Sequence, residues 1–261
     1  MAKRPQVGGK TYHLLLASGD VSRYVLLPGD PGRVSLIAKF WQNAREVARN
    51  REFVTWVGEF GGVKLAATST GIGSGSTAIA IEELLQVGAD TFIRVGTTGA
   101  LRRDIKLGDL IIGSAAVRWD GASRWYVFPE YPAAAHWSIV KALVEAAESL
   151  GARYHVGVVA STDSFYVGQE RPGYGGFLPH WARGLVETLR SLNVLSFEME
   201  SATIFTLASI YGVRAGGIYA AIANRETDEF LPEVGVEDAI RVANEAVKIL
   251  AAYDSKGGTN P

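Results

Sequence analysis

The sequence predicts a single α/β domain. Short runs of β-branched and apolar residues alternate with longer segments of helical periodicity, which is typical of folds whose strands are joined by helices. The 261 residues contain no linker rich in proline and serine that would divide them, so we expect one domain over 1–261. The 30 glycines concentrate at the ends of the predicted strands, where an open α/β sheet binds its ligand.

Seven segments have the apolar, β-branched composition of buried or half-buried strands. In chain order they are Tyr24–Leu27, Lys64–Thr68, Thr91–Val95, Asp109–Val117, Tyr154–Thr162, Val194–Phe197 and Arg214–Ala221.

Four segments between and after these strands have helical spacing of their apolar residues. They are Ser76–Gly88, Trp137–Gly151, Ser201–Gly212 and Glu237–Tyr253. The first two end on glycine, as helix C-termini often do. The third is apolar on almost every side, which predicts that it is buried in the fold or at a subunit contact. Residues 254–261 are Gly-rich and polar and are expected to form a disordered tail.

The composition excludes several classes of protein. A hydrophobic fraction of 48% and a charged fraction of 20% exclude a disordered chain. A formal net charge of -1 argues against broad binding to nucleic acid or an acidic membrane, although a local basic pocket could hold one small anion. The absence of cysteine excludes disulfides, thiolate metal sites and a cysteine nucleophile. No segment resembles a signal peptide or a membrane span, so we expect a cytoplasmic protein.

The turn Pro28–Arg33 follows the first predicted strand and is a candidate anion site. Gly29 lets the backbone approach an anion closely, and the helix that follows offers unpaired N–H groups. Arg33 falls in the first turn of that helix. The alternative interpretation is an ordinary strand–turn–helix connection with a solvated arginine.

The glycine-rich segment Ser69–Ser76 fails the tests for a dinucleotide fingerprint. The third glycine of that pattern is replaced by Ser76, and no acidic residue ends the strand Thr91–Val95 to hold a ribose. No Gly-Lys-Ser/Thr follows, so the segment is not a P-loop either. It predicts only a close-packed turn that presents backbone amides.

Arg94 lies in a segment that otherwise has the composition of a buried parallel strand. A buried arginine is costly unless an acceptor pairs with it, and no acid is near it in sequence. Thr97 and Thr98 add donors where such sheets bind ligands. We therefore expect a bound anion such as phosphate to supply the acceptor. A structural ion pair with a distant carboxylate is the alternative.

Two further segments carry polar groups suited to a nucleoside. Gln169 and Arg171 offer the donors and acceptor that suit the amide edge of a heterocyclic base, with Phe165 to stack on it, although a plain polar loop is the alternative. Glu198 and Glu200 would point the same way on a strand, with Met199 opposite, and could accept hydrogen bonds from sugar hydroxyls. A helix-capping acid pair is the alternative.

Six segments together resemble the nucleoside phosphorylase family over nearly the whole chain. They are Pro-Gly-Asp-Pro-x-Arg at 28–33, Arg-Glu-Phe at 51–53, Ser-Thr-Gly-Ile-Gly at 69–73, Arg-x-Gly-Thr-Thr-Gly at 94–99, Gln-Glu-Arg at 169–171 and Glu-Met-Glu-Ser at 198–201. The resemblance implies a central mixed β-sheet flanked by helices. It also implies a homo-oligomer, with a dimer as the smallest active unit and a hexamer expected.

The resemblance also implies roles for individual residues. Phosphate would be bound by Gly29, Arg33, Arg94 and Thr97, with Arg51 of a neighbouring subunit. The ribose would be held by Met199 and Glu200, with His13 of the neighbour, and the base by Phe165, Gln169 and Arg171, supported by Arg225. Catalysis would rest on Arg94, Gln169, Arg171 and Glu200. No cofactor would be required, although Glu52, Ile72 and Ser76 match positions that hold potassium between subunits in some relatives.

The implied reaction is reversible phosphorolysis of uridine, because Gln169 and Arg171 match the members that act on that nucleoside. Val167, Phe197 and residues 172–179 depart from the family pattern and leave the choice of base open. A phosphorylase of purine nucleosides or of broad specificity is the alternative, and a hydrolytic nucleosidase is more distant. A non-catalytic nucleoside or anion sensor is the alternative from a different class.

Overall fold

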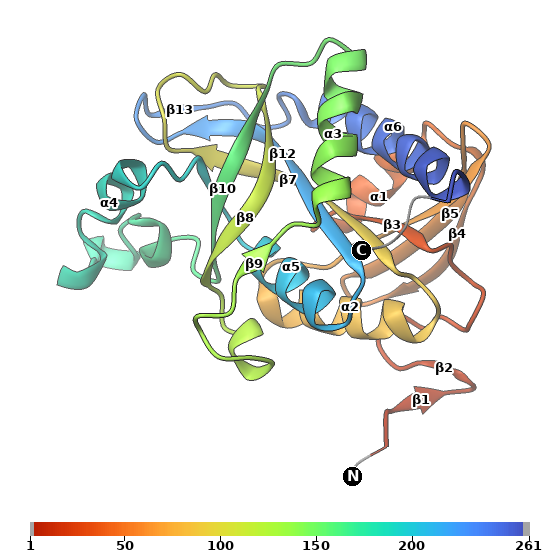
Figure 1. The fold of residues 1–261 in the computed structure, drawn as a ribbon. Helices are drawn as coiled ribbons and strands as arrows, with labels where there is room; N and C mark the ends of the chain where they lie inside the picture. The colour runs from red at the N-terminus through yellow and green to blue at the C-terminus, as the bar shows by residue number, and fades with distance from the viewer. Residues whose placement is uncertain (1–2, 258–261) are drawn as a thin grey trace.

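A mixed β-sheet lies at the centre of the molecule, and helices cover both of its faces (Figure 1). The computed structural model describes residues 3–257. The strands are β1 (Gln6–Val7), β2 (Lys10–Thr11), β3 (Tyr24–Leu27), β4 (Gln42–Asn50), β5 (Phe53–Phe60), β6 (Val63–Thr68), β7 (Thr91–Ala100), β8 (Leu110–Trp119), β9 (Ala133–Ala134), β10 (Tyr154–Thr162), β11 (Ser196–Glu198), β12 (Arg214–Asn224) and β13 (Glu229–Phe230). The helices are α1 (Pro31–Ala38), α2 (Ser74–Gln86), α3 (Trp137–Ser149), α4 (Leu185–Ser191), α5 (Ser201–Ile210) and α6 (Val236–Ser255), with short 3₁₀ turns η1 (Ser123–Trp125), η2 (Val167–Gln169), η3 (Tyr174–Gly176) and η4 (His180–Ala182).

Alternation along the buried strands divides the core into two layers. In β7, Phe92 packs in the cluster that contains α2 and α5, whereas Ile93 packs in the cluster that contains α1, α3 and α6. Successive side chains of a strand point to opposite faces, so both faces of β7 are apolar and both need a cover of helices. The predicted α/β fold with a mixed sheet is confirmed.

Five strands close into a ring. β7 pairs in parallel with β12, β12 pairs antiparallel with β8, and β10 lies parallel to both β8 and β11. β11 then returns antiparallel to β7, with Phe197 opposite Gly99. β3, β6, β5 and β4 extend outward from β7 as an open sheet. The closure brings the C-terminal halves of β7 and β12 beside the end of β11.

The predicted strands all form, but some boundaries differ. Tyr24–Leu27 and Tyr154–Thr162 agree residue for residue, whereas the strand expected over Thr91–Val95 continues to Ala100. It continues because Gly96 leaves room for Tyr219 of β12: a Cβ at Gly96 would lie 3.0 Å from the Tyr219 ring. The β4–β5 hairpin was not predicted, because β4 is a polar, largely exposed edge strand.

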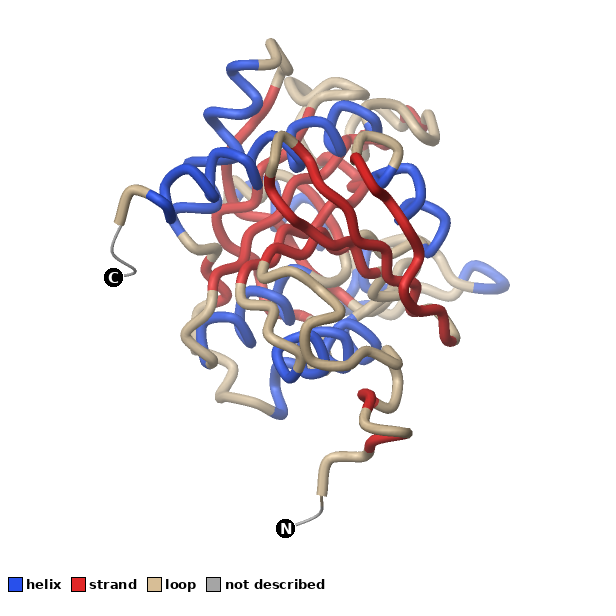
Figure 2. Tube along the Cα trace, turned by 90° about the vertical axis from the view of Figure 1, so that its right-hand side faces the viewer, coloured by secondary structure: helices blue, strands red, loops and turns tan. Residues whose placement is uncertain are grey.

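The N-terminal arm lies apart from the central sheet. The strands β1 and β2 pair only with each other, and this arm extends away from the domain (Figure 2). Within residues 3–257 no helix combines the length and apolarity that crossing a bilayer requires.

The expected disordered tail from 254 is wrong for its first residues, because α6 continues to Ser255. Asp254 accepts hydrogen bonds of 2.8 and 2.7 Å from the Arg214 guanidinium and one of 2.6 Å from the Tyr24 hydroxyl. These contacts fasten the last turn of α6 to β12 and β3. Residues 258–261 of the predicted tail lie outside the described part of the chain.

We expect Asp254→Asn to lower the free energy of unfolding by about 2–3 kcal/mol, since it leaves the buried Arg214 without its carboxylate. Burial would raise the pKa of Asp254, but hydrogen bonds from Arg214 and Tyr24 outweigh it and hold the pKa below its usual value. A lowered folded-state pKa gives stability that is present above the unfolded value of about 4 and lost as pH falls below it.

Urea unfolding at several pH values checks this prediction. The difference between wild type and Asp254→Asn should be constant from about pH 5 to 8 and shrink below about pH 4. Asp104→Asn, which breaks an exposed pair with Arg102, is the control and should cost under about 1 kcal/mol. An equal loss in both variants would contradict the assignment.

Candidate functional site

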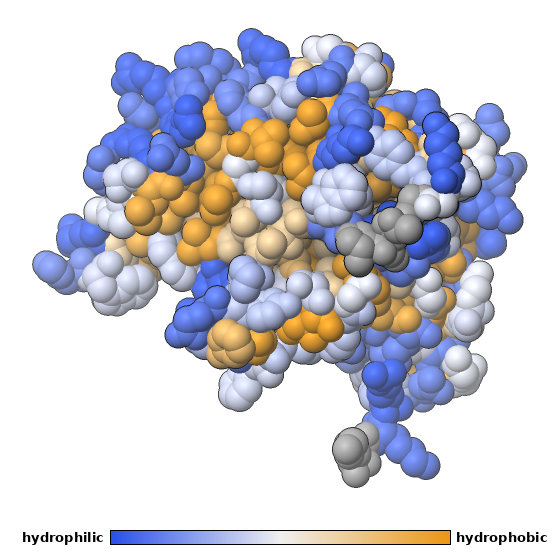
Figure 3. Space-filling model, viewed as in Figure 1, coloured by the Kyte–Doolittle hydropathy of each residue, from blue (hydrophilic) through white to orange (hydrophobic). Residues whose placement is uncertain are grey.

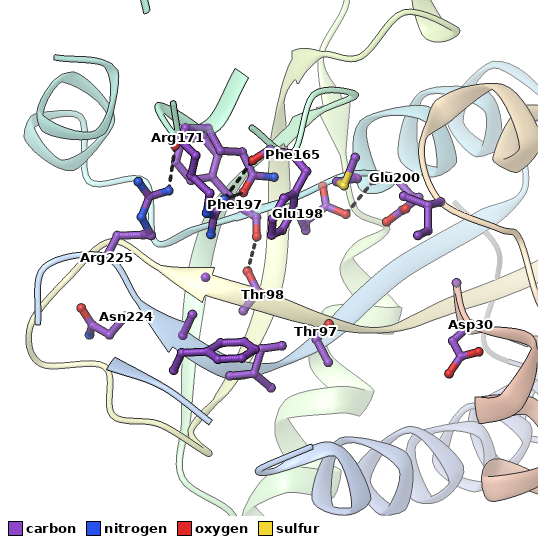
Figure 4. Close-up of a pocket in the computed structure, with 18 of the residues that line it drawn as sticks. Asp30, Thr97, Thr98, Phe165, Arg171, Phe197, Glu198, Glu200, Asn224 and Arg225 are labelled. Atoms are coloured by element: carbon purple, nitrogen blue, oxygen red, sulfur yellow. Dashed lines mark hydrogen bonds between the residues drawn. The ribbon is translucent and has the colours of Figure 1, made fainter. Parts of the chain in front are cut away.

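A cavity of about 450 Å³ opens where β7, β11 and β12 meet, a volume typical of small-molecule sites. In Figure 4, Arg171 and Arg225 lie at one end and Asp30 at the other, with Thr97 and Glu200 between. Most of the predicted site residues line this one cavity: Gly29, Arg33, Ile72, Arg94, Thr97, Phe165, Gln169, Arg171, Met199, Glu200 and Arg225.

Two arginines and a glycine form one end of the cavity. A Cβ at Gly29 would lie 3.2 Å from both terminal nitrogens of Arg94, so glycine is what allows this turn to approach the guanidinium. Asp30 caps α1 by accepting a 2.8 Å hydrogen bond from the Gly32 amide, which fixes the turn and places Arg33 in the first helical turn. Arg33 is 9% exposed and makes no side-chain hydrogen bond or ion pair within residues 3–257.

Two buried guanidinium groups lie close together at this end. Burial lowers the pKa of Arg33, and the neighbouring charge of Arg94 lowers it further. Both causes oppose the charged form, and both would be relieved by an anion bound between the two side chains. The geometry therefore suits phosphate, which guanidinium groups bind through paired hydrogen bonds.

Arg94 does have a protein acceptor, contrary to the expectation that only a bound anion would supply one. Its Nη2 donates to Glu200 Oε2 at 2.5 Å, and both side chains are almost fully buried. Its Nη1 donates weakly to the Leu27 carbonyl and to Thr70 Oγ1. The alternative prediction, an ion pair with a distant carboxylate, is therefore correct for Nη2 of Arg94. Its buried Nε has no partner in the described chain.

Glu198 and Glu200 occupy different environments, so the expected pair of parallel strand carboxylates is wrong. β11 ends at Glu198, and Glu200 is the N-cap of α5. Glu198 accepts from the Ser161 hydroxyl and the amides of Glu200 and Ser201, so it serves as a buried helix cap. Burial, and then repulsion by Glu200, raises the pKa of Glu198. Strand alternation predicted that Met199 would point away from the acids, whereas the family resemblance placed it at the ribose; it lines the cavity beside both acids.

Arg171 and Gln169 form the other end of the cavity. Arg171 lies over the Phe165 ring at 4.2 Å and donates to the Phe165 carbonyl at 3.1 Å. It also donates to Gln169 Oε1. Arg225 donates to the Gln169 carbonyl at 2.7 Å and so helps to hold the Gln169–Arg171 pair in place. Burial, and then the charge of Arg225, lowers the pKa of Arg171 to about 10.

Gln169 has an unused donor that faces the cavity. The side chain is 3% exposed, and its Nε2 donates to no residue within 3–257. Together with Arg171 it presents N–H donors to a planar ligand beside an aromatic ring. Carbonyl oxygens on the ligand would satisfy these donors.

Four predicted residues lie outside the cavity of this chain. His13 donates or accepts through Nδ1 at 2.7 Å from Glu83, which also accepts from the His13 and Leu14 amides. Arg51 is exposed, with its guanidinium 5.9 Å from the Tyr12 ring. Glu52 and Ser76 are the other two.

The side chains of Glu52 and Ser76 both lie close to Gly71, and Ile72 is the next residue in the sequence. A Cβ at Gly71 would be 2.9 Å from both Glu52 Cγ and Ser76 Oγ. The Ser76 hydroxyl is buried and has no partner in the described chain. A carboxylate and an orphan hydroxyl fit a cation that prefers oxygen ligands, but one chain supplies only part of a ligand set.

The sequence did not identify the wall formed by Ile222, Ala223 and the β13 hairpin, including Asp228 and Phe230. Asn224 donates to the carbonyls of Arg102 and Ile105 and accepts from the Glu226 and Thr227 amides. These bonds form the turn that brings β13 back over the cavity. In this region the sequence indicated only Arg225 as a site residue.

Residues 23–253 match the model of the phosphorylase superfamily. A uridine phosphorylase from Thermococcus kodakarensis is 57% identical over 256 residues, which cover 98% of this chain and 92% of the relative. The uridine phosphorylase of Escherichia coli is 43% identical over 242 residues, covering 92% of this chain and 94% of the relative. A guanosine phosphorylase from Halorubrum lacusprofundi is 39% identical over 261 residues, covering 96% and 100%.

These matches confirm the resemblance predicted from the six motifs. They span almost the whole chain and almost the whole length of each relative. The chain belongs to the phosphorylase superfamily.

Proposed function

We propose that the chain catalyses the reversible phosphorolysis of uridine, giving uracil and ribose 1-phosphate, in pyrimidine nucleoside salvage. The observation that carries the proposal is a single cavity with unpaired arginine at one end and a Gln–Arg–Phe base site at the other. The relatives named uridine phosphorylase support the same reaction.

Phosphate would bind at the end formed by Gly29, Arg33, Arg94 and Thr97. Arg33 has no competing side-chain partner among residues 3–257, so it can donate to phosphate oxygens, and Arg94 retains its Nε edge. We expect Arg51 of a neighbouring subunit to complete the phosphate site.

The ribose would lie against Met199, with its hydroxyls donating to Glu200. Both carboxylate oxygens of Glu200 already accept one hydrogen bond, from the Gly73 amide at 2.8 Å and from Arg94. Each oxygen retains a free lone-pair direction for a sugar hydroxyl. His13 of the neighbour would contact the 5′-hydroxyl.

The base would stack on Phe165 and pair with Gln169 and Arg171. In the forward reaction the bond from C1′ to the base nitrogen breaks, and its electron pair leaves with uracil. The sugar carries positive charge at C1′, and a phosphate oxygen forms the new bond there. Gln169 and Arg171 would stabilise the negative charge on the leaving uracil, so no general acid is required. Such preorganised donors are usually the largest catalytic contribution.

We propose a cytoplasmic homo-oligomer with a dimer as its smallest active unit and a hexamer as its expected form. His13 and Arg51 lie outside the cavity of their own chain, which supports a site shared between subunits. An apolar surface lies over β8 and β10 (Figure 3), with Val156 45% exposed. Potassium held by Glu52, Ile72 and Ser76 at a subunit contact belongs to the same proposal, with no cofactor required for the reaction.

The first test is release of base from uridine, thymidine, inosine and guanosine, each with and without phosphate. We expect phosphate-dependent release of uracil and little purine. The guanosine phosphorylase relative makes purine cleavage the second candidate. Purine release in place of uracil would preserve the phosphate site but overturn the base assignment, and release without phosphate would identify a hydrolase.

Arg33→Ala should lower kcat/KM about 100- to 1000-fold, with KM for phosphate raised, because one donor to the anion is lost. Arg33 is preferable to Arg94 as a test, because removing Arg94 would leave Glu200 buried without its partner. The thermal midpoint should be unchanged. Arg241→Ala, which removes an exposed arginine of α6, is the control, and equal activity in both variants would refute the phosphate assignment.

Gln169→Leu removes the amide but keeps a side chain of similar length. We expect kcat/KM for uridine to fall about 100-fold or more, because an unpaired carbonyl of the base is then buried against leucine. KM for phosphate should change little. Steady-state kinetics with each substrate varied in turn checks this, and an unchanged kcat/KM for uridine would rule out base contact by Gln169.

A further inference from the structure

The loop that carries Phe165, Gln169 and Arg171 packs only partly against the rest of the domain. We define the base loop as residues 163–184. It extends from the end of β10 to α4 and projects from the sheet at the left of Figure 1. A cavity of about 750 Å³ lies on the side of the loop away from the base, lined by Trp119, Val167 and Trp181 among others. Part of the loop therefore lacks apolar packing against the sheet, which gives its polar contacts more weight in positioning it.

Asp163 joins the start of the base loop to two other elements. Its Oδ1 accepts from the Ser74 amide at 2.8 Å, and its Oδ2 accepts from the Ser74 hydroxyl at 2.5 Å and the Gly121 amide at 2.6 Å. Ser74 begins α2, and Gly121 follows β8. Asp163 has no ion-pair partner within residues 3–257, so these three charge-assisted bonds hold its carboxylate.

The same turn also holds the carboxylate assigned to the ribose. The Gly73 amide donates to Glu200 Oε1, and the next residue, Ser74, donates to Asp163. Glu200 in turn accepts from Arg94. The turn before α2 therefore connects the Arg94–Glu200 pair directly to the first residue of the base loop.

A second attachment holds the loop further along the chain. Arg225 donates to the Gln169 carbonyl, and η2 packs so closely on the strand end that a Cβ at Gly168 would lie 2.4 Å from Thr162 Oγ1. Phe165 and Gln169 lie two and six residues after Asp163. A shift at Asp163 would move both along the cavity relative to Glu200.

We propose that Asp163 is a positioning residue that sets the distance between the base site and the ribose and phosphate sites. This inference rests on the proposed function. Asp163 touches no substrate; it acts through the Ser74 and Gly121 contacts on Phe165 and Gln169. Its effect should therefore fall on the nucleoside and spare phosphate, whose proposed ligands lie on the β3–α1 turn and β7.

The test is steady-state kinetics of the full-length Asp163→Ala variant with uridine and phosphate varied separately. We expect kcat/KM for uridine to fall about 100-fold, as for a displacement of about 1 Å, while KM for phosphate changes less than about twofold. Asp163→Asn keeps one acceptor oxygen and should restore part of the activity. Ser74→Ala removes one of the three bonds and should cause a smaller loss of the same kind.

Asp109→Ala is the matched control, because Asp109 also accepts from a backbone amide, Lys106, and pairs with Arg153 and His155, away from the cavity. It should lower the thermal midpoint without changing the ratio of the two KM values. Unchanged uridine kinetics in Asp163→Ala, or an equal rise in the KM values for uridine and phosphate, would overturn the inference alone. An inactive wild type would overturn the proposed function and this inference together.

Discussion

The buried pair of Arg94 and Glu200 is the interaction on which the rest of the site depends. Arg94 belongs to the central strand β7, and Glu200 begins the buried helix α5. Neither charge would be tolerated at this depth without the other. Their contact fixes the junction of β11 and α5 against the sheet, and the Gly73 amide adds the turn before α2 to the same point. The pair thus supports the fold while placing groups for two substrates side by side.

The two ends of the cavity differ in how their arginines are paired. In the part of the chain that the structure describes, Arg33 makes no ion pair, whereas Arg171 donates to the neutral acceptor Gln169. An unpaired guanidinium is suited to a full negative charge, and a partly satisfied one is suited to a charge that forms during the reaction. The lowered pKa values of Arg33 and Arg171 have the same cause, which is burial beside another arginine. A ligand bearing negative charge at each end relieves both.

Much of the fold and the motif-bearing part of the site could be predicted from sequence, since apolar periodicity identifies buried strands and helices. The edge hairpin β4–β5 was missed because β4 carries polar residues on both sides and has no alternation to detect. The partner of Arg94 was missed because Glu200 is 106 residues away, and only the closure of β11 onto β7 brings them together. The direction predicted for Met199 was wrong because β11 ends at Glu198, so strand alternation does not extend to Met199. Each error concerns tertiary geometry that local patterns do not encode.

The ten residues of β7 give the site a fixed length. Arg94, Thr97 and Gly99 follow one another along this strand, and the five steps from Arg94 to Gly99 cover about 16 Å. Because the strand is rigid, a substrate can differ at one end only if its other end still binds at the same position. Residues around Gly99, Ala223 and the base loop could therefore diverge and accept a different base while the anion end is kept. We therefore expect relatives that share this strand to differ more in the base they accept than in the anion they bind.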